Sequence, residues 1–123
     1  TGALNERGEH GTIVNAPLRP GANGETFREA FDSRIMPRLE AFGPDLVIVS
    51  AGFDAHWRDP LANLMLESED FAWATKRLMD LADKRCGGRV VSLPSVWRTQ
   101  PSVNASCTAD CTAPPVTAPP PAT

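Results

Sequence analysis

The sequence predicts an α/β fold built on a parallel sheet. A continuous apolar run at residues 46–50 lacks the alternation of a one-sided strand, and residues 89–93 form a second run typical of a buried strand. Such runs are typical of parallel strands that are covered on both faces. A helical pattern at residues 68–86 fills part of the stretch between them. Strand, helix-containing crossover and strand together predict a βαβ unit, from which parallel sheets are built.

The segment before the first apolar run predicts a short strand and one long helix. Residues 12–15 are rich in β-branched side chains and stop before Pro17, which favours a strand. Pro37 lacks the N–H of an interior helical bond, so we expect a kink there or a break near Met36. Hydrophobic side chains spaced three or four positions apart define one face of the helix at residues 25–42: Phe27, Phe31, Ile35, Leu39 and Phe42.

The second helix is expected to begin after an N-cap at Ser68 and to end at Gly87. Acidic residues lie near its beginning and Lys84 and Arg85 near its end, which complements the helix dipole. Cys86 closes the helix and is expected to be buried as a small hydrophobic side chain. The predicted apolar stripe comprises Phe71, Ala74, Thr75, Leu78, Ala82 and Arg85, with Leu81 beside it.

Composition divides the 123 residues into two parts. Residues 1–93 carry the helix and strand patterns, and we expect them to form a fragment of one domain. Residues 94–123 are rich in Pro, Ala, Thr and Ser, and we expect this tail to be disordered because it cannot form a core. Cys107 and Cys111 in the tail form a Cys-x3-Cys pattern, a weak indication of a metal site or a disulfide.

The net charge of −3 and the pI near 5.3 argue against nucleic acid or an anionic membrane surface as a partner. No apolar run approaches the roughly 20 residues that span a bilayer. A charged-then-apolar leader is also missing from the start of the sequence. The cytoplasm is therefore the expected location.

The loop after Ser50 carries the candidate functional residues Gly52, Asp54, His56 and Asp59. Ligands of open parallel sheets bind outside the carboxyl ends of the strands, where this loop begins. Asp54 is the first ionisable group after the strand, so its carboxylate either caps a backbone turn or binds a cation. Position alone favours the turn cap for Asp54 and an ordinary surface position for His56.

The motif SAGFDAH at residues 50–56, followed by DPL at 59–61, closely resembles the zinc-dependent deacetylases of the histone deacetylase family. This superfamily includes acetoin utilisation proteins and acetylpolyamine amidohydrolases, and the likeness is greatest to its bacterial and class II branch. The resemblance covers residues 1–93 and implies the C-terminal portion of an incomplete, three-layer, arginase/deacetylase-like fold. Further motifs match in order: TGA at 1–3, VNAPL at 14–18, FGPDLVIVS at 42–50 and GRVVSL at 88–93.

The resemblance implies a catalytic zinc held by an Asp-x-His motif and by the Asp of the Ala-Gly-Phe-Asp loop. Asp54 matches that second Asp, so the resemblance favours metal binding at Asp54 over turn capping. His56 does not align with the Asp-x-His motif and is expected to be a surface residue or part of the pocket rim. The backbone around Thr12 aligns with a structural potassium site of some members.

Several catalytic residues implied by the resemblance have no counterpart in the sequence. The Asp-x-His ligands and a His pair acting as general base would precede Thr1. After Leu93 the family continues into Glu-Gly-Gly-Tyr, whereas this chain continues PSVWR and contains no Tyr. A frameshift and a genuine Pro-rich linker both remain open as explanations of that change.

We therefore expect a fragment of a deacetylase that acts on acetyl-lysine or acetylpolyamines, inactive as this chain alone. Two alternatives stay open. One is a non-catalytic remnant that acts as a binding module, which would need a core that unfolds cooperatively. The other is one half of a split deacetylase that another polypeptide completes.

Overall fold

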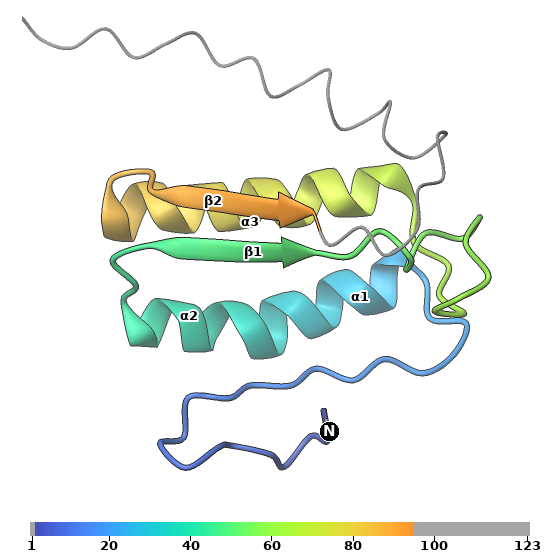
Figure 1. The fold of residues 1–123 in the computed structure, drawn as a ribbon, viewed down its shortest axis with the longest axis horizontal. Helices are drawn as coiled ribbons and strands as arrows, with labels where there is room; N and C mark the ends of the chain where they lie inside the picture. The colour runs from blue at the N-terminus through green and yellow to red at the C-terminus, as the bar shows by residue number, and fades with distance from the viewer. Residues whose placement is uncertain (1, 95–123) are drawn as a thin grey trace, which may run out of the picture.

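Two parallel strands and the helices beside them make up the computed structural model, which describes residues 2–94 (Figure 1). Strand β1 (Val47–Ala51) pairs with β2 (Val90–Pro94), and the register runs from Val47 opposite Val90 to Ala51 opposite Pro94. Both strands begin and end one position later than the sequence predicts. The predicted parallel sheet and α/β class are confirmed, since helix α3 (Ser68–Cys86) lies between the two strands in the chain.

The long helix predicted at residues 25–42 consists of three segments in direct succession. Helix α1 (Gly24–Ala30) continues into a π-helical turn, η1 (Phe31–Ile35), and then into α2 (Met36–Phe42). The Met36 N–H donates to the Phe31 carbonyl, five residues earlier. A wider turn accommodates Pro37, which has no N–H to donate and whose ring would crowd the preceding turn. The predicted break near Met36 is therefore wrong, because the helix continues past that residue through this π-helical turn.

Helix α3 has a different N-cap from the one the sequence predicts. Glu67, and not Ser68, is the N-cap, because Glu67 and Asp70 form a reciprocal capping box. The Asp70 Oδ2 atom accepts the Glu67 N–H at 2.9 Å, and the Glu67 side chain accepts the Asp70 N–H. The helix ends as predicted, at Gly87, whose φ of 59° is the left-handed conformation that favours glycine.

The core of the described residues is small and lies between α3 and one face of the sheet. Val47, Ala82 and Cys86 form its buried cluster, and Val49 and Val90 pack against it. The predicted burial of Cys86 is therefore confirmed. The predicted stripe is wrong at two positions, Thr75 and Arg85, which are exposed. Thr75 instead donates its hydroxyl to the Phe71 carbonyl at 2.8 Å.

Two large hydrophobic side chains, Phe42 and Ile48, are exposed in the described part of the chain. Phe42 is 70% exposed, because α2 ends there and Gly43 turns the chain away. The strands are also not covered on both faces by the described residues, since Ile48 remains 63% exposed. Side chains alternate along a strand, so the inward position of Val47 directs Ile48 to the other face.

The strand predicted at residues 12–15 does not form. Within residues 2–94 this segment pairs with no other strand, and a β-branched run needs a partner to become part of a sheet. Local contacts hold it instead. The Ile13 N–H donates to the Arg7 carbonyl at 3.0 Å, and the Asn15 side chain donates to the Ala3 carbonyl at 2.9 Å.

Candidate metal-ligand loop

The loop that follows β1 is anchored at two places. The Trp57 N–H donates to the Leu66 carbonyl at 2.9 Å, and the Leu66 N–H donates to the Ala55 carbonyl at 3.2 Å. A little further along, the Met65 N–H donates to the Ala22 carbonyl at 2.9 Å, which ties the loop to the residues just before α1. Residues 52–66 therefore have a defined path although they contain no helix or strand.

Asp54 lies in a tight turn just beyond the carboxyl end of β1. The His56 N–H donates to the Phe53 carbonyl at 3.1 Å and closes this turn around Asp54. The Asp54 side chain is exposed and has no hydrogen bond or ion pair with the described part of the chain. It therefore does not cap a turn; Asp59 does, accepting the Leu61 N–H at 2.9 Å. The Asp54 carboxylate remains available to a ligand.

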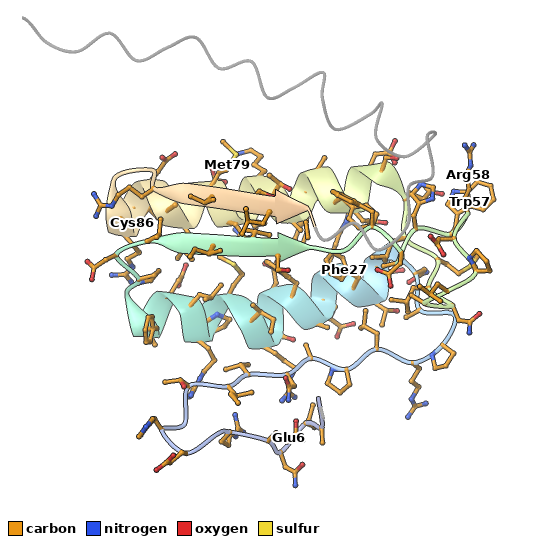
Figure 2. All side chains as sticks on the ribbon, viewed as in Figure 1. Glu6, Phe27, Trp57, Arg58, Met79 and Cys86 are labelled. Atoms are coloured by element: carbon orange, nitrogen blue, oxygen red, sulfur yellow. The ribbon has the colours of Figure 1, made fainter. Side chains whose placement is uncertain are left out.

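His56, expected as a surface residue or as part of the pocket rim, lies against two aromatic side chains. Its ring is half-buried and lies nearly parallel to those of Trp57 and Phe71, with centroids 6.0 Å and 6.4 Å away. The His56 Nδ1 atom accepts the Arg58 N–H at 3.2 Å, so the neutral ring carries its proton on Nε2. Trp57 and Arg58 lie at the outer end of the loop (Figure 2). His56 thus holds the loop that presents Asp54.

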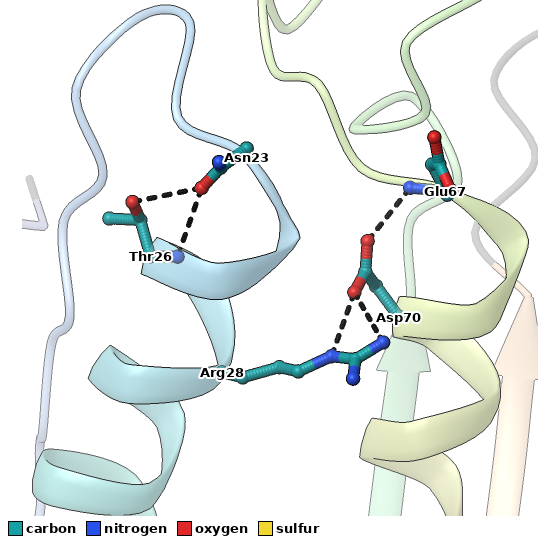
Figure 3. Close-up of polar contacts among 5 residues, drawn as sticks. All are labelled: Asn23, Thr26, Arg28, Glu67 and Asp70. Atoms are coloured by element: carbon teal, nitrogen blue, oxygen red, sulfur yellow. Dashed lines mark hydrogen bonds and ion pairs between the residues drawn. The ribbon is translucent and has the colours of Figure 1, made fainter.

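A buried ion pair fixes the base of the same loop (Figure 3). The Nε atom of Arg28 on α1 donates to Asp70 Oδ1 at 2.9 Å, and its Nη2 atom lies 2.8 Å from the same oxygen in an ion pair. Asp70, at the start of α3, is only 4% exposed and also caps the Glu67 N–H through Oδ2. A Cβ at Gly24 would overlap the Asp70 carboxylate, so the close approach of α1 requires glycine there.

Sequence reasoning missed the Arg28–Asp70 pair, although part of it could have been found. Asp70 three residues after Glu67 is compatible with a capping box, and Asn23 before Gly24 is a common N-cap. Asn23 does cap α1, accepting the Thr26 N–H at 3.1 Å. The ion pair itself joins residues 42 positions apart, and no pattern in the sequence indicates it.

The described residues do not by themselves fit a zinc site. No group of three or more His, Cys, Asp or Glu side chains gathers anywhere in residues 2–94. A catalytic zinc takes three protein ligands, and Asp54 offers one carboxylate. The residues present therefore fit the contribution of a single ligand to a larger site. Cys107 and Cys111 lie outside the described residues.

The potassium site predicted around Thr12 stays a prediction. Thr12 lies in an exposed segment, and the neighbouring Gly11 carbonyl accepts the Arg38 guanidinium at 3.2 Å. Among the helices described, none is both long and apolar enough to cross a bilayer.

The described residues form part of an α/β domain, and its candidate metal-ligating residue, Asp54, follows a parallel strand. Residues 1–95 match the family model described as "Histone deacetylase domain". The chain therefore belongs to the histone deacetylase family, and the resemblance inferred from the sequence is confirmed. The solved structure described next confirms that these residues form an incomplete deacetylase fold of the α/β class.

Three curated relatives and one solved structure illustrate the similarity. The chain is 45% identical over 82 residues to "Uncharacterized protein slr0245" of Synechocystis sp., covering 67% of this chain and 27% of that protein. It is 40% identical over 94 residues to "Histone deacetylase 10, chloroplastic" of Oryza sativa subsp. japonica, covering 74% and 21%. It is 40% identical over 81 residues to "Histone deacetylase-like amidohydrolase" of Pseudomonas aeruginosa, covering 66% and 21%. The structure titled "Crystal Structure of HDA15 HD domain" superposes with a TM-score of 0.76 at 34% identity, covering 88% of this chain and 30% of that one.

The chain thus spans between a fifth and a third of the length of these relatives. The names of two of these relatives, a histone deacetylase and an amidohydrolase, refer to the full-length proteins. What the present residues contribute to such an activity is a separate question, which depends on Asp54 and its loop.

Proposed function

We propose that this chain contributes one zinc ligand, Asp54, to a deacetylase domain that hydrolyses amides of acetyl-lysine or acetylpolyamines. The observation that carries the proposal is the exposed Asp54 carboxylate, which has no partner among residues 2–94 and follows a parallel strand. Membership of the histone deacetylase family supports it, because the resemblance of the motif at residues 50–56 implies that Asp54 matches a zinc ligand of the family. A bound zinc would polarise the amide carbonyl and lower the pKa of a water molecule.

The loop is suited to hold this carboxylate in one place. The turn at Phe53 and His56 fixes the backbone on either side of Asp54, and the His56 ring is held by stacking on Phe71. A ligand held in position before the metal arrives loses less conformational entropy when it binds. Asp54 therefore contributes its negative charge and two oxygen atoms from a preformed loop.

The same proposal includes inactivity of the 123 residues alone. One carboxylate does not satisfy a metal that takes three protein ligands. The sequence has no Tyr to donate to an oxyanion, and of its two His residues His56 already uses Nδ1 as an acceptor for Arg58. Neither the zinc site nor the base is complete without residues beyond those described.

A chimaera tests the role of Asp54. The segment of the Pseudomonas aeruginosa amidohydrolase that matches this chain is replaced by residues 1–95, and zinc content and acetyl-lysine hydrolysis are measured. We expect Asp54→Asn to weaken zinc binding at least about 100-fold, since substitution of groups that merely contact metal ligands already costs about 10–100-fold. Asp45→Asn is the matched control, because Asp45 is an exposed residue that lies just before the first residue of β1, at the end of the strand far from Asp54.

Two results would contradict the proposal. Equimolar zinc retained by the Asp54→Asn chimaera would show that this carboxylate is not a ligand. Acetyl-lysine hydrolysis with tightly bound equimolar zinc in the 123-residue chain alone would show that the chain needs no completion.

A further inference from the structure

One face of the sheet is apolar and uncovered by the described residues. We call Ile48, Val91 and Leu93 the open sheet face; they are 63%, 46% and 57% exposed. Ile48 is the register partner of Val91, and Leu93 is that of Ser50, so the three side chains lie together on two neighbouring strands. The other face packs on α3 through Val47, which is buried.

This exposure is unusual for parallel strands. Parallel sheets occur almost only with both faces covered, and the mostly apolar sequences of both strands are suited to that environment. The open sheet face contains no charged residue, so nothing in it would attract nucleic acid or an anionic lipid surface. A contiguous apolar surface of this kind marks a contact with other protein.

The comparison with the solved deacetylase structure indicates which polypeptide would cover the open sheet face. This chain superposes over 88% of its length on only 30% of the HDA15 HD domain, with a TM-score of 0.76. The same elements thus form part of a single domain about three times as large. We propose that the open sheet face is the docking surface for the remainder of a deacetylase domain, and that this remainder binds it even when supplied as a separate polypeptide.

Only one consequence of the docking, completion of a zinc site at Asp54, rests on the proposed function. Asp54 lies just beyond the carboxyl end of β1, the strand that carries Ile48. A protein segment seated on Ile48 therefore lies next to the strand that leads into the Asp54 loop. Docking on the open sheet face would bring the missing ligands toward Asp54, whereas the docking itself does not depend on zinc.

Co-production tests the docking surface. The full 123-residue chain is produced together with the Pseudomonas aeruginosa amidohydrolase from which the matching segment has been deleted, and also co-refolded with it from denaturant. We expect a one-to-one complex in both arms by size-exclusion chromatography with light scattering. Ile48→Lys and Val91→Lys should each weaken the complex at least about tenfold, because each buries a charge in an apolar contact. Phe42→Lys is the control, a substitution at a side chain that is equally apolar and 70% exposed but lies on α2.

Circular dichroism of the isolated variants shows whether each remains folded, and Ile48→Ala provides a milder change at the same position. Loss of the complex in the two strand variants but not in Phe42→Lys would support the docking surface. Absence of a complex in both arms, equal weakening by all three lysines, or a dimer of this chain that Ile48→Lys abolishes would overturn it. A complex that forms on the open sheet face but holds no zinc would support the docking surface and contradict the role of Asp54.

Discussion

The buried ion pair between Arg28 and Asp70 should be the largest single polar contribution to the stability of this chain. Asp70 is 4% exposed and accepts two hydrogen bonds, one from Arg28 Nε and one from the Glu67 N–H, while Arg28 Nη2 adds an ion-pair contact at 2.8 Å. Removing one partner of a fully buried pair costs about 3–5 kcal/mol. The Arg28 side chain is 41% exposed, so water can solvate it after the change and the cost is reduced. For Asp70→Asn we expect a loss of about 2–3 kcal/mol in the free energy of unfolding, the sum of weakened charged hydrogen bonds and a weakened cap.

Urea unfolding of the full chain at neutral pH, followed by circular dichroism, measures this loss. Asp80→Asn is the control, because Asp80 pairs with Lys76 at 3.0 Å on the exposed surface of α3. Such a pair contributes about 0.3–0.5 kcal/mol. The small core, with six buried hydrophobic residues among those described, leaves little stability to spare. Asp70→Asn should therefore lower the urea midpoint strongly and could leave the chain unfolded in buffer.

Equal effects of Asp70→Asn and Asp80→Asn would refute the reasoning, because burial would then add nothing to the ion pair. A double-mutant cycle with Arg28→Met separates the pair from the cap. If the pair matters, the two substitutions should couple by at least about 1 kcal/mol, since residues in contact through a charged hydrogen bond are not additive. A coupling near zero would assign the whole effect to the Glu67 cap.

Two further predictions concern the same region. Gly24→Ala should destabilise the chain by about 1–3 kcal/mol in urea unfolding, because its Cβ overlaps the Asp70 carboxylate; a smaller penalty in the Asp70→Ala background would identify that overlap as the cause, and an unchanged penalty would exclude it. His56→Phe should speed amide exchange at Arg58 about 2- to 10-fold by removing the Nδ1 acceptor, whereas His56→Asn keeps an acceptor. Equal exchange rates in the two His56 variants would contradict the role of that hydrogen bond.

Elements with a continuous or periodic apolar pattern could be predicted from the sequence to within a residue or so. The run before Ser50 became β1, and the turn at Gly87 ended α3 where expected. The segment at residues 12–15 has equally good strand composition but found no partner among the described residues. Amino-acid composition indicates that a segment can form a strand, whereas strand pairing depends on whether another strand lies beside it in the fold.

In the candidate site, too, local features could be predicted from the sequence, whereas contacts between distant segments could not. Asp54 can be proposed as a ligand from the sequence alone, because its place after a strand and its motif are both local properties of the sequence. The role of His56 was missed because it depends on Phe71, fifteen positions away on another element. The Arg28–Asp70 pair was missed for the same reason. Contacts between distant segments need the fold before they can be named.

Ile48 lies on β1 and Asp54 lies just beyond the carboxyl end of that strand, and both side chains are exposed. Two of the contacts that hold the described residues together, the Arg28–Asp70 pair and the core around Ala82, involve α3. Ile48 and Asp54 take part in neither. Asp70→Asn should therefore reduce the stability of the isolated chain, whereas Ile48→Lys should leave it folded and reduce only its association. If Ile48→Lys instead unfolded the chain as Asp70→Asn does, the open sheet face would be part of the chain's own core and not a surface for another polypeptide.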